Sequence, residues 1–159
     1  MASLVSAQGP HVNPEWAKLY GDSLDQRPHK VKAFGDGVYV AGEMDWNGTV
    51  YGTFSKFNPT TGSLIWHFRM NISSSFSDFE WDPVQDLFVV VGGTQPFSSS
   101  VDNKSLAVLV DDTGIAQRVR EFDFIGREGF TTIVRHQMPP DPAFPFSVLV
   151  VKYPSPNTP

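Results

Sequence analysis

Short runs of apolar and β-branched residues, separated by turn residues, follow one another along most of the chain. Residues 53–57 alternate apolar and polar side chains, residues 64–70 form a β-rich run, and residues 87–91 are apolar throughout. Alternation is typical of a half-buried strand, and a short apolar run between turns is typical of a fully buried one. The pattern therefore predicts an all-β fold, in which residues 14–20 are the best candidate for a helix, only two turns long.

The runs recur with a period of about fifty residues. The segment Val-Tyr-Val-Ala-Gly at 38–42 and the segment Phe-Val-Val-Val-Gly at 88–92 are fifty positions apart. Two Thr-Gly turns, which end at Gly62 and Gly114, are fifty-two apart, and Trp16 and Trp66 are again fifty apart. A period of this length that holds four short strands is typical of the blades of a β-propeller.

This period divides the chain into propeller-type blades of four-stranded antiparallel sheets. We expect a flexible leader before the blades and a flexible tail after them. In chain order the predicted segments are a leader at 1–13, an outer strand at 14–21, blades at 30–70 and 76–124, a partial blade at 129–153 and a tail at 154–159.

Two stretches carry a resemblance to known propeller families. Residues 56–69, Lys-Phe-Asn-Pro-Thr-Thr-Gly-Ser-Leu-Ile-Trp-His-Phe-Arg, resemble the repeat of quinoprotein-like (PQQ-type) propellers. Residues 16–22 and 37–42 are similar to the bacterial seven-bladed β-propeller repeats, so that the resemblance covers about 14–137. It implies that Trp66, four residues after Gly62, packs between blades. The second copy departs from this pattern, because Arg118 stands four residues after Gly114.

The resemblance implies no activity or cofactor, because no cofactor-binding or catalytic residue of the quinoprotein dehydrogenases is matched. It also implies a ring that one chain of about three units does not close, since a propeller has at least four blades, or about 200 residues. Residues 146–151 form an apolar strand, either the second or the third of its blade. We expect the open edges to pair with a second copy, with further sequence or with a protein partner.

Connections in such blades alternate between two faces. Tight turns are predicted at 35–37, 58–62, 82–86 and 111–114, and long polar loops at 43–51, 71–77, 95–104 and 125–129. Long loops on a rigid scaffold often carry binding residues. We therefore expect the loop face to be functional and the turn face to be plain.

The loop face supplies the candidate ligand-binding residues. Trp46, between Asp45 and Asn47, is placed to stack on a sugar or to contact a partner, and Phe97 and Phe76 are further exposed-aromatic candidates. The alternative is that these rings fold back onto the loops as staples. Trp66 and Trp81 are expected in the core.

Three glycosylation sequons fall in the same predicted loops, with acceptors at Asn47, Asn71 and Asn103. The small residues of 5–7 also resemble the end of a secretion signal, or else belong to a simple leader. We therefore expect an extracellular or cell-surface glycoprotein, with accidental sequons as the alternative.

Composition narrows the chemistry. The formal charge of −5 gives no overall attraction to nucleic acid, no run is apolar enough for a membrane helix, and cysteine is absent, which excludes thiol chemistry and Cys-ligated metals. The four histidines, at 11, 29, 67 and 136, form no metal-binding pair, and no nucleophile elbow or phosphate-binding loop is present. The carboxylates at 111 and 112 are expected to cap their own turn.

We therefore expect a non-catalytic propeller repeat protein that binds or scaffolds, with no catalytic or metal site. Two alternatives remain open. One is an enzyme domain, quinoprotein-like or hydrolytic, completed by missing blades or another subunit. The other is a carbohydrate-binding module.

Overall fold

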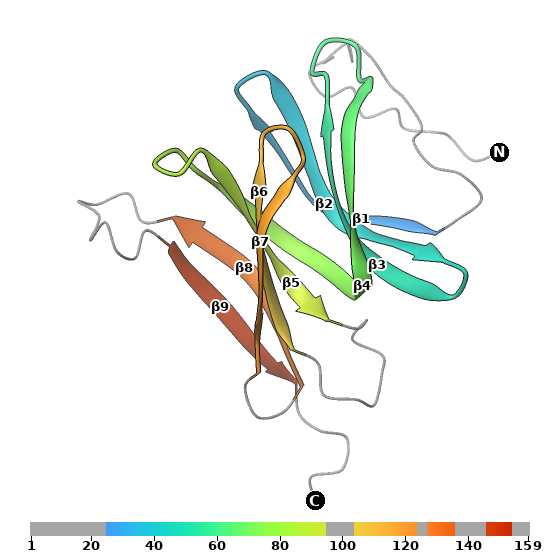
Figure 1. Cartoon of the computed structure of the whole chain (residues 1–159), viewed down its shortest axis with the longest axis vertical. Helices are drawn as coiled ribbons and strands as arrows, with labels where there is room; N and C mark the ends of the chain where they lie inside the picture. Colours follow the sequence, from blue (N-terminus) through green and yellow to red (C-terminus); the bar gives the residue numbers. More distant parts are fainter. Residues whose placement is uncertain (1–24, 95–103, 124–126, 136–145, 154–159) are drawn as a thin grey trace, which may run out of the picture.

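Nine β-strands make up the regular structure of the protein in a computed structural model that describes residues 25–94, 104–123, 127–135 and 146–153 (Figure 1). No helix occurs in these ranges, and so none that could cross a membrane. The all-β prediction is confirmed. In chain order the strands are β1 (Gln26–Phe34), β2 (Gly37–Trp46), β3 (Thr49–Phe57), β4 (Leu64–Asp82), β5 (Leu87–Thr94), β6 (Ser105–Asp111), β7 (Ala116–Phe122), β8 (Arg127–Arg135) and β9 (Phe146–Tyr153).

Strands β1 to β7 form one antiparallel sheet in which spatial order follows chain order. Strand β4, 19 residues long, joins two halves of this sheet. Its first half pairs with β3, from Leu64 to Ser73, and its second half pairs with β5, from Ser74 to Asp82. Each half of the sheet is thus a four-stranded antiparallel meander, which we call unit 1 (β1 to the first half of β4) and unit 2 (the second half of β4 to β7).

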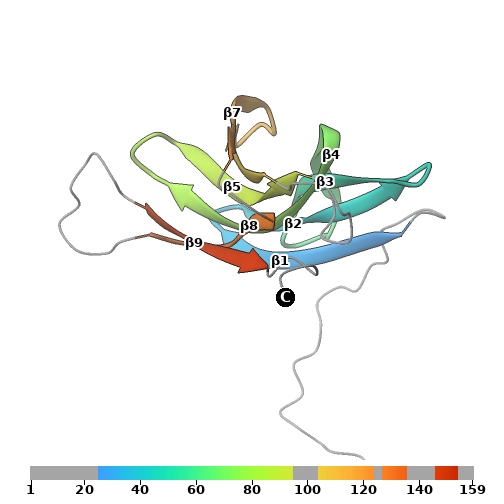
Figure 2. The same cartoon turned by 90° about the horizontal axis from the view of Figure 1, so that it is seen from below.

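The hairpin β8–β9 is a separate two-stranded sheet. Strand β9 pairs directly with β8, so residues 146–151 belong to the strand that follows β8 in the pairing order. In the view of Figure 2, β1 and β9 lie on one side of the molecule and β7 on the opposite side.

Two of the predicted long loops are wrong. Residues 71–77 lie inside β4, and residues 43–51 form the ends of β2 and β3 around a two-residue turn, Asn47-Gly48. Both turn residues have positive φ, 52° and 77°, as Asn-Gly hairpins require. Residues 95–103 lie outside the described residues, and Arg127 opens β8 within the range expected to be the last loop.

The serines of residues 73–77 explain the first error. Ser74 and Ser75 are buried, and the Ser74 hydroxyl accepts a hydrogen bond from the Gly52 amide at 3.0 Å. Small polar side chains are accommodated here because the strands approach closely. Phe76, expected to be exposed in that loop, is a fully buried core residue.

The same irregularity occurs in β1, β4 and β8. The register shifts between Pro28 and Lys30 in β1, between Phe76 and Asp78 in β4, and between Phe130 and Thr132 in β8. At each shift, one strand has an extra residue that has no partner on the opposite strand, and such a site is a β-bulge. The three bulged residues are His29, Ser77 and Thr131.

Each of the first two bulges reaches the next one through a hydrogen bond. The His29 Nδ1 atom lies 2.8 Å from the Phe76 carbonyl oxygen, and the Ser77 hydroxyl donates to the Phe130 carbonyl oxygen. Phe76 and Phe130 hold the same place before their bulges. The contact between β1 and β4 is therefore repeated between β4 and β8.

The main core lies between units 1 and 2 and is aromatic. Phe54 of unit 1 packs against Phe79 and Phe88 of unit 2, with ring centroids 4.9 and 5.3 Å apart. Such pairs add about 0.5–1.5 kcal/mol each beyond the apolar area they bury. A second cluster, Val91, Phe130 and Ile133, fills the space between unit 2 and β8. Unit 2 is covered on both faces, which accounts for the continuous apolar run of β5.

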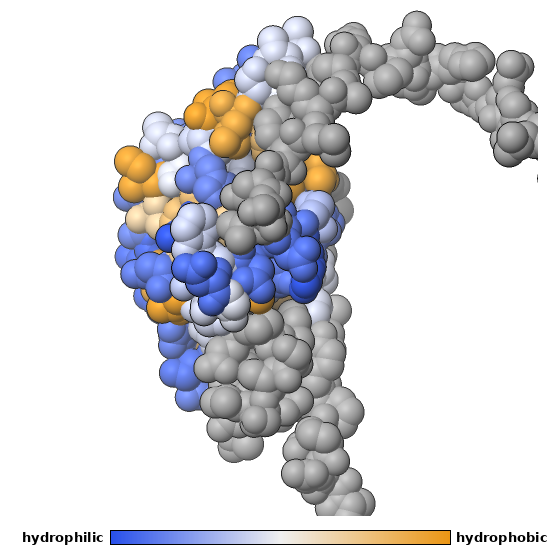
Figure 3. Space-filling view, turned by 90° about the vertical axis from the view of Figure 1, so that its right-hand side faces the viewer, coloured by the Kyte–Doolittle hydropathy of each residue, from blue (hydrophilic) through white to orange (hydrophobic). Residues whose placement is uncertain are grey.

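The surface drawn in Figure 3 is mostly hydrophilic, and its apolar residues form small separate patches. The predicted leader, outer strand and tail, at 1–13, 14–21 and 154–159, lie outside the described residues, as does the candidate helix at 14–20.

Candidate functional site

The sequence-predicted binding residues form the tip of the β2–β3 hairpin. Trp46 is 45% exposed, and the Asp45 carboxylate accepts a hydrogen bond from the Gly48 amide at 2.9 Å. The guanidinium of Arg69 lies 5.6 Å from the Trp46 ring centroid and 4.9 Å from that of Tyr51. A cation therefore lies against the Trp46 ring, and nearly half of this residue remains exposed. Phe97 lies outside the described residues.

Of the three sequon acceptors, Asn47 and Asn71 are exposed. Asn47 occupies the hairpin turn, and Asn71 lies within β4 rather than in a loop. Asn103 lies outside the described residues.

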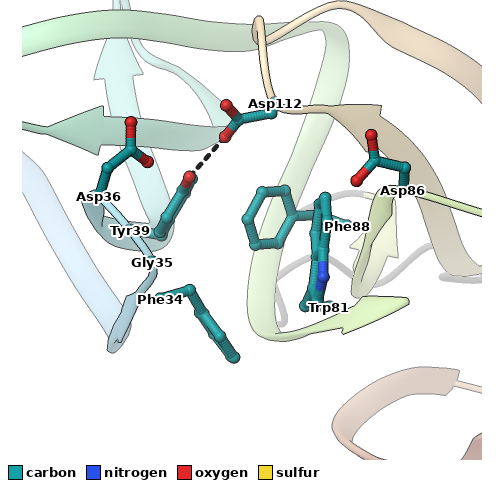
Figure 4. A pocket seen from close by; sticks show the side chains of 8 residues that line it. All are labelled: Phe34, Gly35, Asp36, Tyr39, Trp81, Asp86, Phe88 and Asp112. Atoms are coloured by element: carbon teal, nitrogen blue, oxygen red, sulfur yellow. Dashed lines mark hydrogen bonds between the residues drawn. The ribbon is translucent and has the colours of Figure 1, made fainter. Parts of the chain in front are cut away.

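A pocket of about 310 Å³ opens at the junction of units 1 and 2, on the side of the tight turns (Figure 4). Three turns converge on it: the β1–β2 turn with Gly35 and Asp36, the β4–β5 turn with Asp86, and the β6–β7 turn with Asp112. Its aromatic wall comes from both units and consists of Phe34, Tyr39, Trp81 and Phe88.

The rings of this wall are held by one another. Phe88 is buried, and its centroid lies 4.3 Å from that of Tyr39 and 4.6 Å from that of Trp81. Phe34 contacts the same ring at 6.1 Å in an edge-on arrangement. Phe88 therefore packs against each of the other three rings of the wall.

One buried cation organises the carboxylates on the unit 1 side. The Lys56 ammonium lies 2.9 Å from both carboxylate oxygens of Asp112 and 3.0 Å from Asp36. The Lys56 side chain is only 5% exposed, whereas those of Asp112 and Asp36 are 50% and 82% exposed. The Tyr39 hydroxyl donates to Asp112 at 2.5 Å, the bond drawn in Figure 4.

The pKa values of these groups follow from this arrangement. Burial, together with the hydrogen bond to Asp112, raises the pKa of Tyr39 to about 12. Burial by itself lowers the pKa of Lys56, but hydrogen bonds with Asp112, Tyr39 and Asp36 outweigh it and the pKa is raised. The hydrogen bond and charge of Lys56 lower the pKa of Asp36. Lys56 is therefore charged at neutral pH, where it pairs with both carboxylates.

Two further carboxylates hold the turns in place. Asp111 accepts hydrogen bonds from the Thr113 hydroxyl at 2.6 Å and from the Thr113 and Ile115 amides at 2.9 and 3.0 Å. Burial raises the pKa of Asp111, but these bonds and one from the Gln117 side chain outweigh it and lower the pKa. Asp82 is buried and accepts from the Val84 amide at 2.9 Å. The expectation that residue 111 caps its own turn is confirmed, whereas Asp112 binds across to unit 1.

Trp66 ties the β6–β7 turn to unit 1. Its indole Nε1 donates to the Asp112 carbonyl oxygen at 2.8 Å, and its ring lies against Gly114, which has a φ of 84°. The ring also packs 5.5 Å from Phe54. Trp66 thus lies between the two units, the place expected for it.

Sequence reasoning missed the pocket itself. Its residues are spread from 34 to 112 and come together only when the two units pack face to face. The signal available was the tight turns, each with an aspartate: 36, 86 and 112. These turns were expected to form the plain face.

No protein-family model matches the chain, and a search of curated proteins finds no match either.

Proposed function

We propose that this chain is a propeller-type repeat segment that acts as a non-catalytic binding scaffold. The observation that carries the proposal is the repeated contact between bulged strands. His29 reaches the Phe76 carbonyl oxygen, and Ser77 reaches the Phe130 carbonyl oxygen, one unit further on. Contacts that recur from unit to unit are expected when blades pack around an axis.

Ionic contacts between the same strands support this proposal. Lys30 of β1 lies 3.3 Å from the Asp78 carboxylate, and the Thr132 hydroxyl of β8 donates to Asp78 at 2.7 Å. Two positions further along, Lys32 pairs with Glu80 at 2.6 Å. In propeller terms β1, the second half of β4, and β8 would be the strands nearest the axis. The next unit beyond them would come from further sequence, a second copy or a partner.

A binding role fits the pocket better than turnover. Three of the described charged groups at the pocket are tied to one another, because Lys56 neutralises Asp112 and Asp36 in part and Asp112 also holds Tyr39. Groups arranged in this way stiffen the turns and leave parts of the Phe34 and Trp81 rings accessible in the pocket. A preformed apolar pocket with a few polar groups is a usual ligand site.

The test is a backbone-amide NMR titration of the folded chain with short peptides, oligosaccharides and small organic ions. We expect at least one class to shift amides in the three turns around the pocket and to be recovered unchanged. Chemical conversion of a bound compound, or the absence of any binding in these turns, would overturn the proposal.

An extracellular or cell-surface setting belongs to the same proposal, since Asn47 and Asn71 are exposed sequon acceptors. Expression through a secretory pathway should add glycan mass that Asn47→Gln and Asn71→Gln each reduce. An unmodified secreted chain would contradict this part alone.

A further inference from the structure

We propose that the pocket between units 1 and 2 binds an alkylammonium group. This inference rests on the binding role proposed above and names the ligand class. It depends on three features of the pocket: its aromatic wall, the unequal distribution of its charges, and its size.

The wall offers ring faces of the kind that attract cations. A cation within about 6 Å of a ring centroid gains about 0.5–2 kcal/mol, and tryptophan is the best partner. Trp81 and Phe34 are half-buried, so each ring keeps an accessible part in the pocket. In Figure 4, Phe34 lies to the lower left of the buried Phe88 ring, and Trp81 lies on the right-hand side of that ring.

On the unit 1 side of the pocket, the ammonium group of Lys56 is already bound by an aromatic ring and by carboxylates. Its ammonium lies 5.4 Å from the Tyr39 ring centroid, with Asp112 and Asp36 beside it. An ammonium group held by a ring and by carboxylates is therefore part of the native structure here.

The unit 2 side of the pocket also has aromatic rings beside a carboxylate, but no ammonium group of the described residues is paired with that carboxylate. Asp86 is exposed in the β4–β5 turn and lines the pocket together with Trp81 and Phe88. Among the ion pairs of the described residues, none involves Asp86. Lys32, which lies 6.0 Å from the Phe34 centroid, is paired with Glu80. The lining thus has three carboxylates and one bound ammonium, which leaves it negative.

Size favours an organic cation over a bare metal ion. In the described part of the chain, no three carboxylate or imidazole groups come close enough together to hold a metal. The carboxylates stand apart around a space of about 310 Å³. That volume is at the lower end of small-ligand pockets and accommodates a quaternary ammonium head with its first substituents.

The experiment compares choline with 3,3-dimethylbutan-1-ol, which has the same shape and no charge, by NMR titration of the chain and of four variants. Asp86→Asn removes one carboxylate, and asparagine tolerates the φ of 58° at this position. Asp123→Asn is the matched control, since Asp123 is exposed and lies beyond the end of β7 that is remote from the β6–β7 turn. Trp81→Leu removes the ring, and Trp81→Phe keeps an aromatic face.

We expect choline to bind at least about tenfold more tightly than its neutral isostere. Asp86→Asn and Trp81→Leu should each weaken choline binding about three- to tenfold and leave the isostere unchanged. Asp123→Asn should change neither ligand, and Trp81→Phe should restore most of the choline affinity. The amide spectrum of each variant shows that it is folded.

Equal affinity for the two ligands, or equal effects of Asp86→Asn and Asp123→Asn, would overturn the alkylammonium inference and leave the binding role standing. Absence of choline binding, with peptides or oligosaccharides still shifting the turn amides, would do the same. Only the failure of every probe class would overturn the binding role as well.

Discussion

The Lys56 ammonium lies 2.9 Å from both carboxylate oxygens of Asp112, and this bidentate pair joins a strand of unit 1 to a turn of unit 2. The lysine is almost fully buried, whereas the aspartate is half-exposed. Lys56 is therefore paired where burial makes an unpaired charge costly. The pair fixes the rim of the pocket as well as the junction of the two units.

Lys56→Met keeps the length of the side chain and removes its charge. We expect a loss of about 1–3 kcal/mol in unfolding free energy, because Asp112 and Asp36 lose their shared cation. Denaturant unfolding of Lys56→Met, Asp112→Asn and the double variant gives the coupling energy. A coupling of about 1 kcal/mol is expected for a direct pair; strictly additive losses would contradict it.

The raised pKa of Tyr39 predicts that the folded protein loses stability at high pH. Its pKa is raised from 10.0 to about 12 in the folded protein, so the folded state holds the phenolic proton more tightly than the unfolded state does. The stabilisation is fully present below pH 10.0 and is lost as the pH rises through about 12. Unfolding free energies across this interval should fall more steeply for the wild type than for Tyr39→Phe. Parallel profiles would contradict the assignment.

The lowered pKa of Asp78 predicts that the folded protein loses stability in acid. Burial raises its pKa, but hydrogen bonds from Thr132, Phe79 and Ile133 and the charge of Lys30 outweigh burial and lower it below 3.8. The stabilisation is therefore present above pH 3.8 and is lost as the pH falls through the lower folded-state pKa.

Asp78→Asn should cost about 2–4 kcal/mol at neutral pH, because this side chain joins β1, β4 and β8. The penalty should shrink as the pH falls through the titration range of the carboxyl group. Denaturant unfolding at several pH values measures both effects, with Asp123→Asn as the exposed control. A pH-independent penalty would show that the charge of Asp78 does not matter.

Gly92 lies opposite the bulge of β4, where the Ser75 carbonyl group occupies the space that a Cβ atom would need. Gly92→Ala should therefore cost about 3 kcal/mol, since backbone must move to admit the methyl group. Gly35, with a φ of 51° and nothing within 4 Å of a Cβ atom, provides the control. Gly35→Asn should cost less than about 1 kcal/mol, because asparagine tolerates positive φ. Thermal unfolding compares the two; similar losses would argue against the close approach at the bulge.

Gly42 is opposite the bulge of β1 and meets the Arg27 carbonyl group in the same way. Gly42→Ala should match Gly92→Ala in its effect. A large loss at one position and none at the other would show that the two bulges are not equivalent.

Interactions between residues close together in the chain determine the fold class and the turns of this protein. The all-β class and the recurrence of strands after about fifty residues could be predicted, because each depends on residues close together in the chain. The same holds for the tight turns predicted at 35–37 and 111–114, which the structure has at 35–36 and 112–115. The position of Trp66 between the units was also expected, in this case from the resemblance of residues 56–69 to a propeller repeat.

The errors arose where distant strands decide the environment of a residue. The serines of residues 73–77 suggest a loop, but opposite glycines let two strands close over them and keep β4 continuous. Phe76 is buried for the same reason. The Asn47-Gly48 turn, by contrast, had a local signal for a two-residue hairpin that a reading of residues 43–51 as one polar loop overlooked.

The chain by itself thus determined which residues form strands and turns, since side-chain alternation and turn propensity act over a few residues. Only the tertiary structure decided that Asp36, Asp86 and Asp112 surround one aromatic pocket and that Lys56 joins two units. These residues stand up to 76 positions apart in the chain, and they come together because the aromatic faces of both units must be buried against each other.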